Sequence, residues 1–406
     1  MVYVLSKDGL PLMPTQRHGK VRRLLKNAEA KVVRRTPFTI QLLYDSITFT
    51  QPITLGIDAG SKTVGLSATT EAKELFASEC ALRADVVENL SIRRENRRVR
   101  RGRKTRYRKP RFNNRVKSKH KGCLAPSCLQ KINTHLQLVK QVHKILPITK
   151  IVVEVAQFDI QKIKNPNIQG EEYQQGEQLN FWNLREYVLF RDGHKCQGKK
   201  GCKGEILNVH HIETRKTGGD APNNLVTLCK DCHTAYHEGG LKLNLKRGQS
   251  FRDAAFMGIM RWSLYNKLKE TYENVSIIYG YETKHRRISN GLEKSHAVDA
   301  RCVTGNPKAK PIERVYKQKA TRVHNRQIHK RKMLKGGVRK LNQVPKYVYG
   351  YELFDKVRYK GKELFIWGRR QRGYFLLKSL DDKIKIDGIS VKKIKLLERR
   401  KAILTA

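Results

Sequence analysis

Short apolar runs that each contain one acid recur along the chain and predict strands of a sheet. Residues 54–66 hold two apolar runs around a turn with Gly60, which predicts a β-hairpin that carries Asp58. Residues 150–156 are apolar, rich in β-branched side chains and too short for a core helix, so they predict a buried strand that carries Glu154. A buried carboxylate is costly unless a cation or hydrogen bonds compensate it. Both acids therefore require a chemical explanation.

A later segment adds a histidine and a third acid. Residues 295–300 predict a helix in which His296 and Asp299, three positions apart, project from one face. Two Mg²⁺ ions roughly 3.5 to 4 Å apart can clamp the attacking and leaving oxygens of a phosphodiester. Each acid taken singly could be an ordinary strand-end or helix-surface residue. Taken together, they predict a divalent-metal centre formed by Asp58, Glu154, His296 and Asp299.

Helical periodicity and chain length indicate what surrounds these acids. Apolar positions at helical spacing over 129–146 and 251–272 predict helices that pack on the sheet, and residues 275–281 predict another strand. A chain of 406 residues exceeds the usual size of one hydrophobic core. We therefore expect several modules.

The two ends of the chain differ in pattern from this middle part. Near the N-terminus we expect a strand at 2–5, a basic helix at 18–28 and a strand at 31–40. Residues 308–340 are basic with little apolar periodicity, and we expect them to order only on RNA. Alternating runs between 347 and 391, separated by turn signals, predict a small antiparallel barrel.

The charge balance points to a polyanionic partner. Lys and Arg number 85 against 36 acids, which gives a net charge of +49, and such an excess repels itself unless a polyanion neutralises it. A basic membrane-surface protein is the alternative. However, no stretch is long and apolar enough to span a bilayer, and the N-terminus lacks a signal-peptide core. We therefore expect a cytoplasmic, nucleic-acid-binding protein.

Residues 93–121 are the most basic part of the chain, with 16 Lys or Arg and a single acid, Glu95. Cations recur at helical spacing around most of the circumference, so a helix here would have no core face and would bridge domains or lie against a ligand. Guanidinium groups suit phosphate oxygens, and Tyr107 and Phe112 could stack on bases. A solvated or disordered charge run is the alternative. The candidate nucleic-acid-binding residues are Arg93, Arg94, Arg97, Arg98, Arg100, Arg101, Arg103, Lys104, Arg106 and Arg108.

Four cysteines have the spacing of a structural zinc site. Cys196 and Cys202 are followed by Cys229 and Cys232 as a C-x-x-C pair. Without a secretory signal, such thiols indicate tetrahedral Zn²⁺ rather than disulfides. The first pair is wider than the usual spacing, and buried free thiols are the alternative.

The residues between and after these cysteines resemble the HNH, or ββα-metal, endonuclease motif. The resemblance rests on His210-His211, the Gly-Gly-Asp at 218–220, Asn224 and His233. It implies that His211 is the general base for the attacking water, which suits an imidazole whose ordinary pKa is about 6.5. It also implies that His210 and His233 hold one divalent ion and that Asn224 orients the loop carrying His211.

Two points about this motif stay open at the level of sequence. His237 is a weaker candidate ligand than His210 and His233. Many relatives have Asp where His210 stands, and the imidazole leaves the metal open because hard Mg²⁺ favours oxygen. The histidines could also merely help the cysteines to hold zinc.

The order of Asp58, Glu154 and Asp299 resembles the RuvC-type nuclease, an RNase H-like fold. Its first aspartate lies on strand one, its glutamate on strand four and its last aspartate on a late helix. The Pro-Leu-Met-Pro at 11–14 and the Arg-Arg-x-Pro-Phe-Thr-Ile at 34–40 resemble the N-terminal domain of the IscB family, and an arginine-rich bridge helix lies at the same place in that family. IscB proteins are transposon-encoded RNA-guided nucleases related to the type II CRISPR effectors.

This resemblance implies an α/β multidomain protein in which a mixed RNase H-like sheet is split by a bridge helix and by an inserted zinc-containing HNH domain. The expected parts are an N-terminal domain at 1–53, RuvC-like parts at 54–90, 122–162 and 251–305, the bridge helix at 91–121, linkers at 163–180 and 241–250, the HNH domain at 181–240, a basic RNA-binding segment at 306–340 and a C-terminal β domain at 341–406 that would contact RNA and a short motif beside the target.

The implied activity is RNA-guided cleavage of double-stranded DNA by a monomeric protein bound to a guide RNA. The HNH domain would cut the guide-paired strand, and the RuvC-like centre would cut the displaced strand. The RuvC-like centre would hold two Mg²⁺ and the HNH domain one, and Mn²⁺ could replace Mg²⁺. A separate Zn²⁺ would be structural. One alternative is a protein-guided HNH or junction-resolving nuclease that needs no RNA. Another is an RNA-binding scaffold with an inactive nuclease core.

Overall fold

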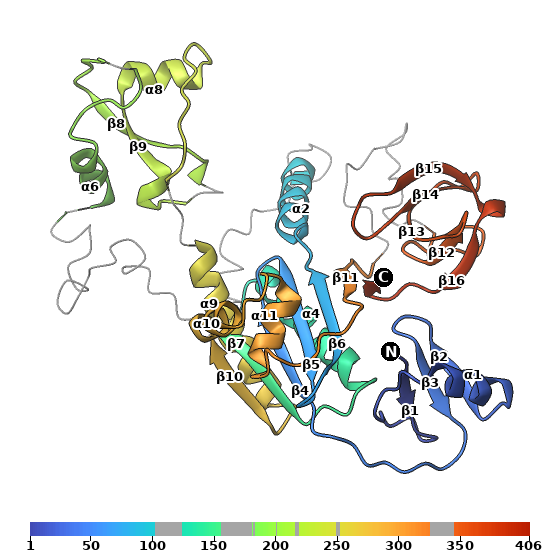
Figure 1. Cartoon of the computed structure of the whole chain (residues 1–406). Coiled ribbons are helices and arrows are strands. Elements are labelled where there is room, and N and C mark those ends of the chain that lie inside the picture. Colours follow the sequence, from blue (N-terminus) through green and yellow to red (C-terminus); the bar gives the residue numbers. More distant parts are fainter. Residues whose placement is uncertain are drawn as a thin grey trace. The chain divides into compact units, whose positions relative to one another are not determined.

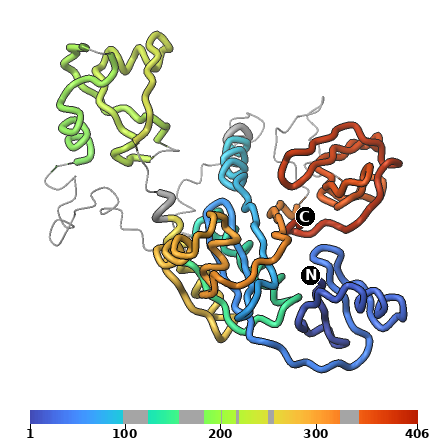
Figure 2. The backbone as a smooth tube through the Cα atoms, in the orientation of Figure 1, coloured from blue at the N-terminus to red at the C-terminus, as the bar shows by residue number. Residues whose placement is uncertain are grey.

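The computed structural model describes residues 1–101, 124–155, 181, 183–199, 201–215, 219–248, 252–324 and 345–406, without the side chains of 98–101 and 252–255. The chain folds into two compact units (Figures 1 and 2). The first comprises Met1–Ala156 and Met257–Ala406, and the second comprises Gln157–Phe256. Among the described residues, no helix is both long and apolar enough to cross a membrane.

Within the described part of the first unit, seven strands form one mixed sheet: β4 (Thr54–Ala59), β5 (Thr63–Thr69), β6 (Glu74–Ala81), β7 (Lys150–Val155), β10 (Val275–Tyr279), β11 (Tyr316–Ala320) and β17 (Ile403–Thr405). Their order across the sheet is β10-β7-β4-β5-β6-β11-β17. β4, β5 and β6 form an antiparallel meander, whereas β7 runs parallel to β4, and β10 runs parallel to β7 (Figure 1). The expected hairpin around Asp58 and the expected strand around Glu154 are thus present.

Helix α11 (His296–Val303) lies directly on one face of this sheet because two glycines permit it. A Cβ on Gly56 would clash with the carbonyl oxygen of Ala300, and a Cβ on Gly65 would clash with that of His296. Side chains two positions apart share a face of a strand, so Asp58 points to the same side as Gly56. The close approach of the helix therefore brings His296 to Asp58.

Helix α4 (Pro126–His143) packs on the opposite face and confirms the helix expected at 129–146. Its Leu138 and Val142 line one small cavity together with Leu66, the residue after Gly65. Two adjacent strand positions point to opposite faces, so Gly65 faces α11 and Leu66 faces α4. The sheet is consequently covered on both sides, and its core is fully buried at Leu55, Ile57, Leu66, Ile132 and Leu138.

Three further helices belong to this part of the chain. They are α2 (Val86–Arg101), α10 (Gly280–Ser289) and α9 (Arg252–Lys269), of which α9 belongs to this unit from Met257 onward. The start of the expected bridge helix is helical, but α2 already begins at Val86, and the rest of that segment lies outside the described residues. The expected strand at 275–281 ends at Tyr279, because the side chain of Glu282 accepts a hydrogen bond from Tyr279 N and caps α10 there.

A small sheet with the order β1-β3-β2 and one helix form the N-terminal part. Its elements are β1 (Tyr3–Leu5), α1 (His18–Lys26), β2 (Ala30–Arg34) and β3 (Thr39–Leu42). The single strand expected at 31–40 is wrong. Residues 35–38 form a turn around Pro37, which has no N–H for a strand ladder, and β2 and β3 pair antiparallel across it.

The C-terminal part is an antiparallel sheet with the order β15-β14-β13-β12-β16. Its strands are β12 (Lys356–Tyr359), β13 (Lys362–Arg369), β14 (Tyr374–Lys378), β15 (Lys385–Ser390) and β16 (Lys395–Glu398). The expected alternation is confirmed from Lys356 onward, but the expected strand at 347–349 is instead a tight turn closed by Val348 and Tyr351. The expectation that all of 308–340 lacks order is also wrong, since β11 adds to the large sheet with Tyr316, Gln318 and Ala320 buried and Lys317 exposed.

The second unit contains a two-stranded sheet and a helix that follows it. Its elements are α6 (Leu184–Arg191), β8 (Leu207–His211), the 3-10 turn η2 (Pro222–Asn224), β9 (Leu225–Cys229) and α8 (Lys230–His237). β8 and β9 pair antiparallel, so the order is ββα. Leu241, Leu243 and Leu245 of the expected exit linker pack against the cysteine core, which shortens the segment that could act as a hinge.

Candidate functional site

Three histidines of the second unit form one cluster. His210 is the penultimate residue of β8, before His211, and His233 and His237 lie one turn apart on α8. One ring nitrogen of each lies within 4.8 Å of the others. His210 is buried, and its Nε2 has no hydrogen-bond partner among the residues that the structure describes. A buried, unpaired imidazole nitrogen beside two more imidazoles is the arrangement that a metal ion would satisfy.

The protonation of these histidines also suits a metal. Burial, together with the neighbouring His233 and His237, lowers the pKa of His210 to about 4. Burial and then His237 also lower the pKa of His233. A neutral imidazole is the form that binds metal. His237, the weaker candidate from the sequence, is part of this group because its i,i+4 spacing from His233 puts both on one face of α8.

The neighbouring His211 has a different environment. Its Nε2 lies 2.9 Å from Oδ1 of Asp220, and Oδ2 of the same carboxylate accepts hydrogen bonds from Arg215 Nε at 3.0 Å and Nη2 at 2.9 Å. The hydrogen bond from the His211 ring, followed by the one from Arg215, holds the pKa of Asp220 below its usual range. A carboxylate on Nε2 selects the tautomer in which Nε2 carries the proton and Nδ1 presents a lone pair.

Asn224 holds the loop between His211 and Asp220. It is fully buried, and its Oδ1 accepts a hydrogen bond from Glu213 N at 2.9 Å. Its Nδ2 donates to the carbonyl oxygens of Glu213 and Gly219, each at 2.9 Å. One amide therefore ties both arms of the loop together, which fits the orienting role expected for it.

The four cysteines meet at the start of α8, where Cys229 is the N-cap residue and Cys232 lies in the first turn. The sulfur atoms of Cys196, Cys202, Cys229 and Cys232 lie within 4.8 Å of one another. Cys202 Sγ is 3.6 Å from Cys229 Sγ and 3.8 Å from Cys232 Sγ. Four Zn–S bonds of about 2.3 Å in a tetrahedron place sulfurs about 3.8 Å apart. A Cβ on Gly204 would lie 2.7 Å from Cys229 Sγ, so the loop must have glycine there. These thiols fit Zn²⁺.

In the first unit, Asp58 and His296 form the closest contact among the predicted ligands. Asp58 is almost fully buried at the end of β4, and its Oδ2 lies 2.7 Å from His296 Nδ1. This hydrogen bond, followed by the charges of Asp58 and Glu79, raises the pKa of His296 against the opposing effect of burial. The two residues are far apart in sequence and are joined because α11 crosses β4.

Glu154 and Asp299 each contact an arginine that sequence reasoning missed. Glu154 Oε1 lies 3.1 Å from Arg261 Nη2, and both side chains are about nine-tenths buried. Arg287 Nε lies 2.9 Å from Asp299 Oδ1 without hydrogen-bond geometry, so charge holds that pair. Burial and the nearby Asp58 carboxylate raise the pKa of Glu154 to about 7, and the same two causes raise the pKa of Asp299.

The predicted metal ligands of the first unit thus share one end of the sheet, but their oxygens do not gather as closely as the histidines do. Within the described ranges, the groups of three or more ligand atoms mutually closer than 4.8 Å are the four cysteines and the three histidines. Two ions roughly 4 Å apart need a wider ligand set than one ion does. Like charges also repel unless cations compensate them, and here Arg261 pairs with Glu154 and Arg287 pairs with Asp299.

The bridge-helix candidates are only partly described. Arg93 and Arg94 are exposed on α2, and Arg97 is half-buried. Arg98, Arg100 and Arg101 belong to the same helix. Arg103, Lys104, Arg106 and Arg108, with Tyr107 and Phe112, lie outside the described residues.

Two protein families match parts of the chain. Residues 2–176 match the family described as RRXRR protein, and residues 194–239 match the family described as HNH endonuclease. The second match spans the four cysteines, the three clustered histidines and the His211–Asp220 pair. Residues 194–239 therefore match an HNH endonuclease domain.

Individual relatives also match parts of the chain. Anaredoxin of Nostoc sp. is 46% identical over 41 residues, which are 10% of this chain and 54% of that protein. Streptococcus thermophilus Cas9 in complex with the GGAA PAM is 16% identical, with a TM-score of 0.33, over 51% of this chain and 30% of that chain. The type II-C Cas9 enzyme from Actinomyces naeslundii is 11% identical, with a TM-score of 0.26, over 63% of this chain and 60% of that chain. The chain spans less than two thirds of each of these proteins.

Proposed function

We propose that the protein is an RNA-guided, metal-dependent DNA endonuclease with two cleavage centres, one in each unit. The observation that carries the proposal is the cluster of His210, His233 and His237 beside the His211–Asp220 pair within a matched HNH domain. Neutral metal ligands next to an oriented base are the parts that phosphodiester hydrolysis needs.

In the HNH domain, each side chain has a separate task. His211 accepts a proton from the attacking water at Nδ1, since Asp220 occupies Nε2. His210, His233 and His237 hold a divalent ion, which would polarise the scissile phosphate when bound. Three imidazoles favour a transition-metal ion over Mg²⁺, which prefers oxygen. Asn224 holds the loop between His211 and Asp220 in its conformation. Zinc bound to the four cysteines would fix the start of α8.

In the first unit, the strand order supports an RNase H-like assignment. The meander β4-β5-β6 followed by the parallel β7 and β10 matches that fold's order, with Asp58 on the first strand and Glu154 on the fourth. Asp299 is on a late helix, as in RuvC-type nucleases. Asp58, Glu154, Asp299 and His296 would hold Mg²⁺ and cut the displaced strand, while the HNH domain cuts the strand paired with the guide.

RNA guidance is supported by charge. The net charge of +49 calls for a polyanion, and the exposed Arg93 and Arg94 of α2 begin the most basic run of the chain. A guide RNA held along this run would take over sequence recognition by base pairing, leaving the protein to recognise backbone shape and a short flanking motif.

The test of guidance is the nucleic acid that accompanies the purified protein. The protein is purified at moderate salt, and the bound material is digested with RNase or DNase and sequenced. One discrete structured RNA with a variable segment at one end is the expected result. Heterogeneous nucleic acid removed by high salt would instead indicate non-specific binding, and a protein-guided HNH nuclease would replace this proposal.

A further inference from the structure

Three exposed tyrosines gather in the C-terminal part of the chain. Tyr347, Tyr349 and Tyr374 have 51%, 62% and 46% of their surface exposed. The Tyr349 ring lies over Gly373, the residue that precedes Tyr374, and Tyr347 lies two positions before Tyr349. We call these residues the tyrosine surface, and we propose that it stacks unpaired bases of a bound RNA. This inference rests on the proposed function, because it specifies where part of the guide RNA binds.

Tyr349 occupies a backbone position that disfavours it. Val348 and Tyr351 exchange both backbone hydrogen bonds, so Tyr349 and Gly350 form a two-residue turn. Their φ angles are +50° and +76°, and such turns favour Asn, Asp or Gly at both central positions. A bulky residue with positive φ is a true outlier. The backbone preference therefore does not explain a tyrosine here, and a contact made by the ring must explain it.

The Tyr349 ring rests on a second turn. A Cβ on Gly373 would lie 3.2 Å from Tyr349 Cε2 and 3.4 Å from its Cζ, so the ring covers the bare backbone of Gly373. The turn closed by Gly373 carries the exposed Arg370 and Arg372. One side of the ring is thus supported by protein, and the exposed remainder is open to a flat ligand.

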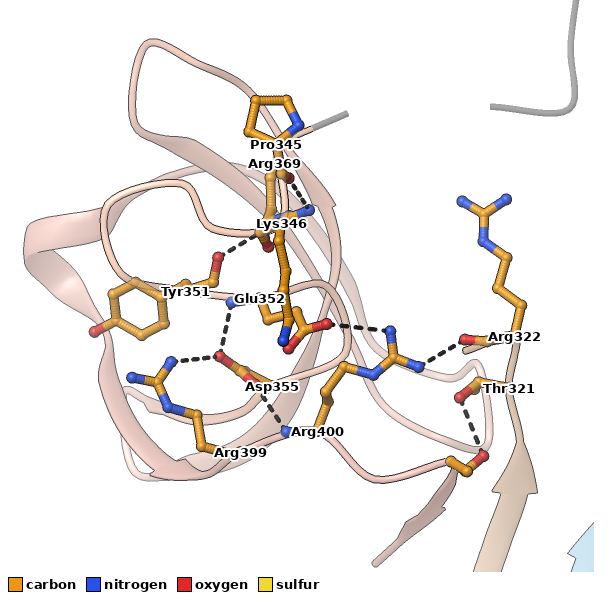
Figure 3. Close-up of polar contacts among 11 residues, drawn as sticks. Thr321, Arg322, Pro345, Lys346, Tyr351, Glu352, Asp355, Arg369, Arg399 and Arg400 are labelled. Atoms are coloured by element: carbon orange, nitrogen blue, oxygen red, sulfur yellow. Dashed lines mark hydrogen bonds and ion pairs between the residues drawn. The ribbon is translucent and has the colours of Figure 1, made fainter. Parts of the chain in front are cut away.

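A hydrogen-bond network around the buried Asp355 fixes the first turn in place (Figure 3). Arg369 donates to the carbonyl oxygens of Lys346 at 2.6 Å and Tyr351 at 2.8 Å. Arg399 donates to the carbonyl oxygen of Gly350 at 2.6 Å and to Asp355 Oδ2 at 3.1 Å. Asp355 is fully buried and also accepts from Glu352 N and Arg400 N, each at 2.8 Å. The backbone around Tyr347 and Tyr349 is therefore held in position before any ligand arrives.

Cations lie among these rings. Lys346 Nζ is 5.1 Å from the centre of the Tyr347 ring, and the Arg399 guanidinium carbon is 5.9 Å from it. Arg370 pairs with Asp387 at 2.7 Å. Aromatic rings interleaved with Lys and Arg are the pattern that binds single-stranded nucleic acid, because bases stack while the cations contact phosphates. Bases within a duplex are already stacked on one another, whereas the bases of unpaired nucleotides in a structured RNA can stack on protein side chains.

The direct test replaces the ring without changing charge. In Tyr349→Asn, the turn becomes Asn-Gly, the preferred sequence for this conformation. The full-length protein, stripped of nucleic acid, is titrated with a fluorescent uridine RNA of about 12 nucleotides, within the site size of such folds, across a range of salt. We expect affinity to fall on the order of five- to tenfold, the lower part of the range for one stacked base. The slope of log affinity against log salt should stay the same, because no phosphate contact is lost. The melting temperature should be equal or higher.

The matched control is Tyr44→Asn, the same change at an exposed tyrosine outside this surface. It should leave RNA affinity unchanged to within about twofold. Unchanged affinity in Tyr349→Asn would overturn the proposal, and so would a loss confined to duplex DNA or to a DNA strand of the same sequence. A lower melting temperature with unchanged affinity would make the ring purely structural. The assay needs no cleavage, so failure of the nuclease assignment would leave its result readable.

Discussion

The two candidate cleavage centres differ in the side chains that would bind metal. In the HNH domain, His210, His233 and His237 already lie within 4.8 Å of one another. In the first unit, Asp58 hydrogen bonds to His296, whereas Glu154 and Asp299 are each paired with an arginine. Neutral imidazoles can gather without a cation, but carboxylates cannot, because they repel one another in a buried site. The comparison therefore predicts a preformed HNH site and a first-unit site in which metal must displace protein cations.

The largest effect should come from removing zinc. In Cys232→Ser, one of four sulfur ligands is lost, and structural zinc of this type contributes on the order of 10 kcal/mol to folding. We expect the second unit to lose its fold, shown by rapid proteolysis within 184–237, and the protein to lose one equivalent of zinc while the first unit stays protected. Cys128→Ser, at a buried thiol of α4 outside the cluster, should keep its zinc. Retained zinc in Cys232→Ser would break the assignment.

The next effect tests the preformed histidine site. In His237→Ala, one of three ligands is lost, and we expect Mn²⁺ affinity of the HNH domain to fall by about 100-fold, with zinc content unchanged. Isothermal titration with Mn²⁺ measures it. His194→Ala, in the same unit but outside the cluster, serves as the control. Equal Mn²⁺ affinity in both variants would remove His237 from the site.

The strands and the helix that carry the acids can be predicted from sequence, because short β-branched runs and the i,i+3 pair are local signals. Arg261 and Arg287 cannot, because their contacts with Glu154 and Asp299 depend on how distant segments pack. The i,i+4 spacing of His237 from His233 is a local signal that predicts both side chains on one face of a helix.

Two other features show where pattern alone fails. The lysine-rich sequence of β11 conceals the alternation of Tyr316, Gln318 and Ala320, so the strand is missed. Asp220 is visible in the Gly-Gly-Asp motif, but its contact with His211 requires the loop geometry set by Asn224.

A smaller effect concerns pH in the first unit. Burial and the Asp58 carboxylate raise the pKa of Glu154 to about 7 from an ordinary value of 4.5. The folded state thus binds this proton more tightly than the unfolded state, so its contribution is most favourable below pH 4.5 and is lost as pH rises through 7. Without metal, we expect the free energy of unfolding to fall by roughly 3 kcal/mol over that window.

Chemical denaturation in EDTA at several pH values measures this change. Glu154→Gln keeps the side chain's shape but cannot titrate, so its curve should be flatter. Mg²⁺ binds the charged carboxylate and should reduce the loss above pH 7 for the original protein only. If the free energy of unfolding in EDTA depended on pH in the same way for both proteins, the predicted contribution of Glu154 would be contradicted.

The smallest effect isolates the orientation of His211. Asp220→Asn retains a polar partner but removes the carboxylate that selects the tautomer, and we expect kcat of HNH cleavage to fall about tenfold or more with KM little changed. Arg215→Gln, which leaves the His211–Asp220 contact in place, should have a weaker effect. A rise in KM alone in Asp220→Asn would mean that the carboxylate helps to bind DNA rather than to orient His211.

The most direct test of two separate centres is cleavage of a duplex whose strands carry different labels, with RNA-loaded His211→Ala and Asp58→Ala proteins. We expect His211→Ala to slow cleavage of the guide-paired strand by a factor on the order of 100 to 10,000, the usual range for losing a general base, and to spare the displaced strand. Asp58→Ala should do the reverse. Loss of both cuts in either variant, with RNA and DNA binding intact, would contradict the assignment of two centres.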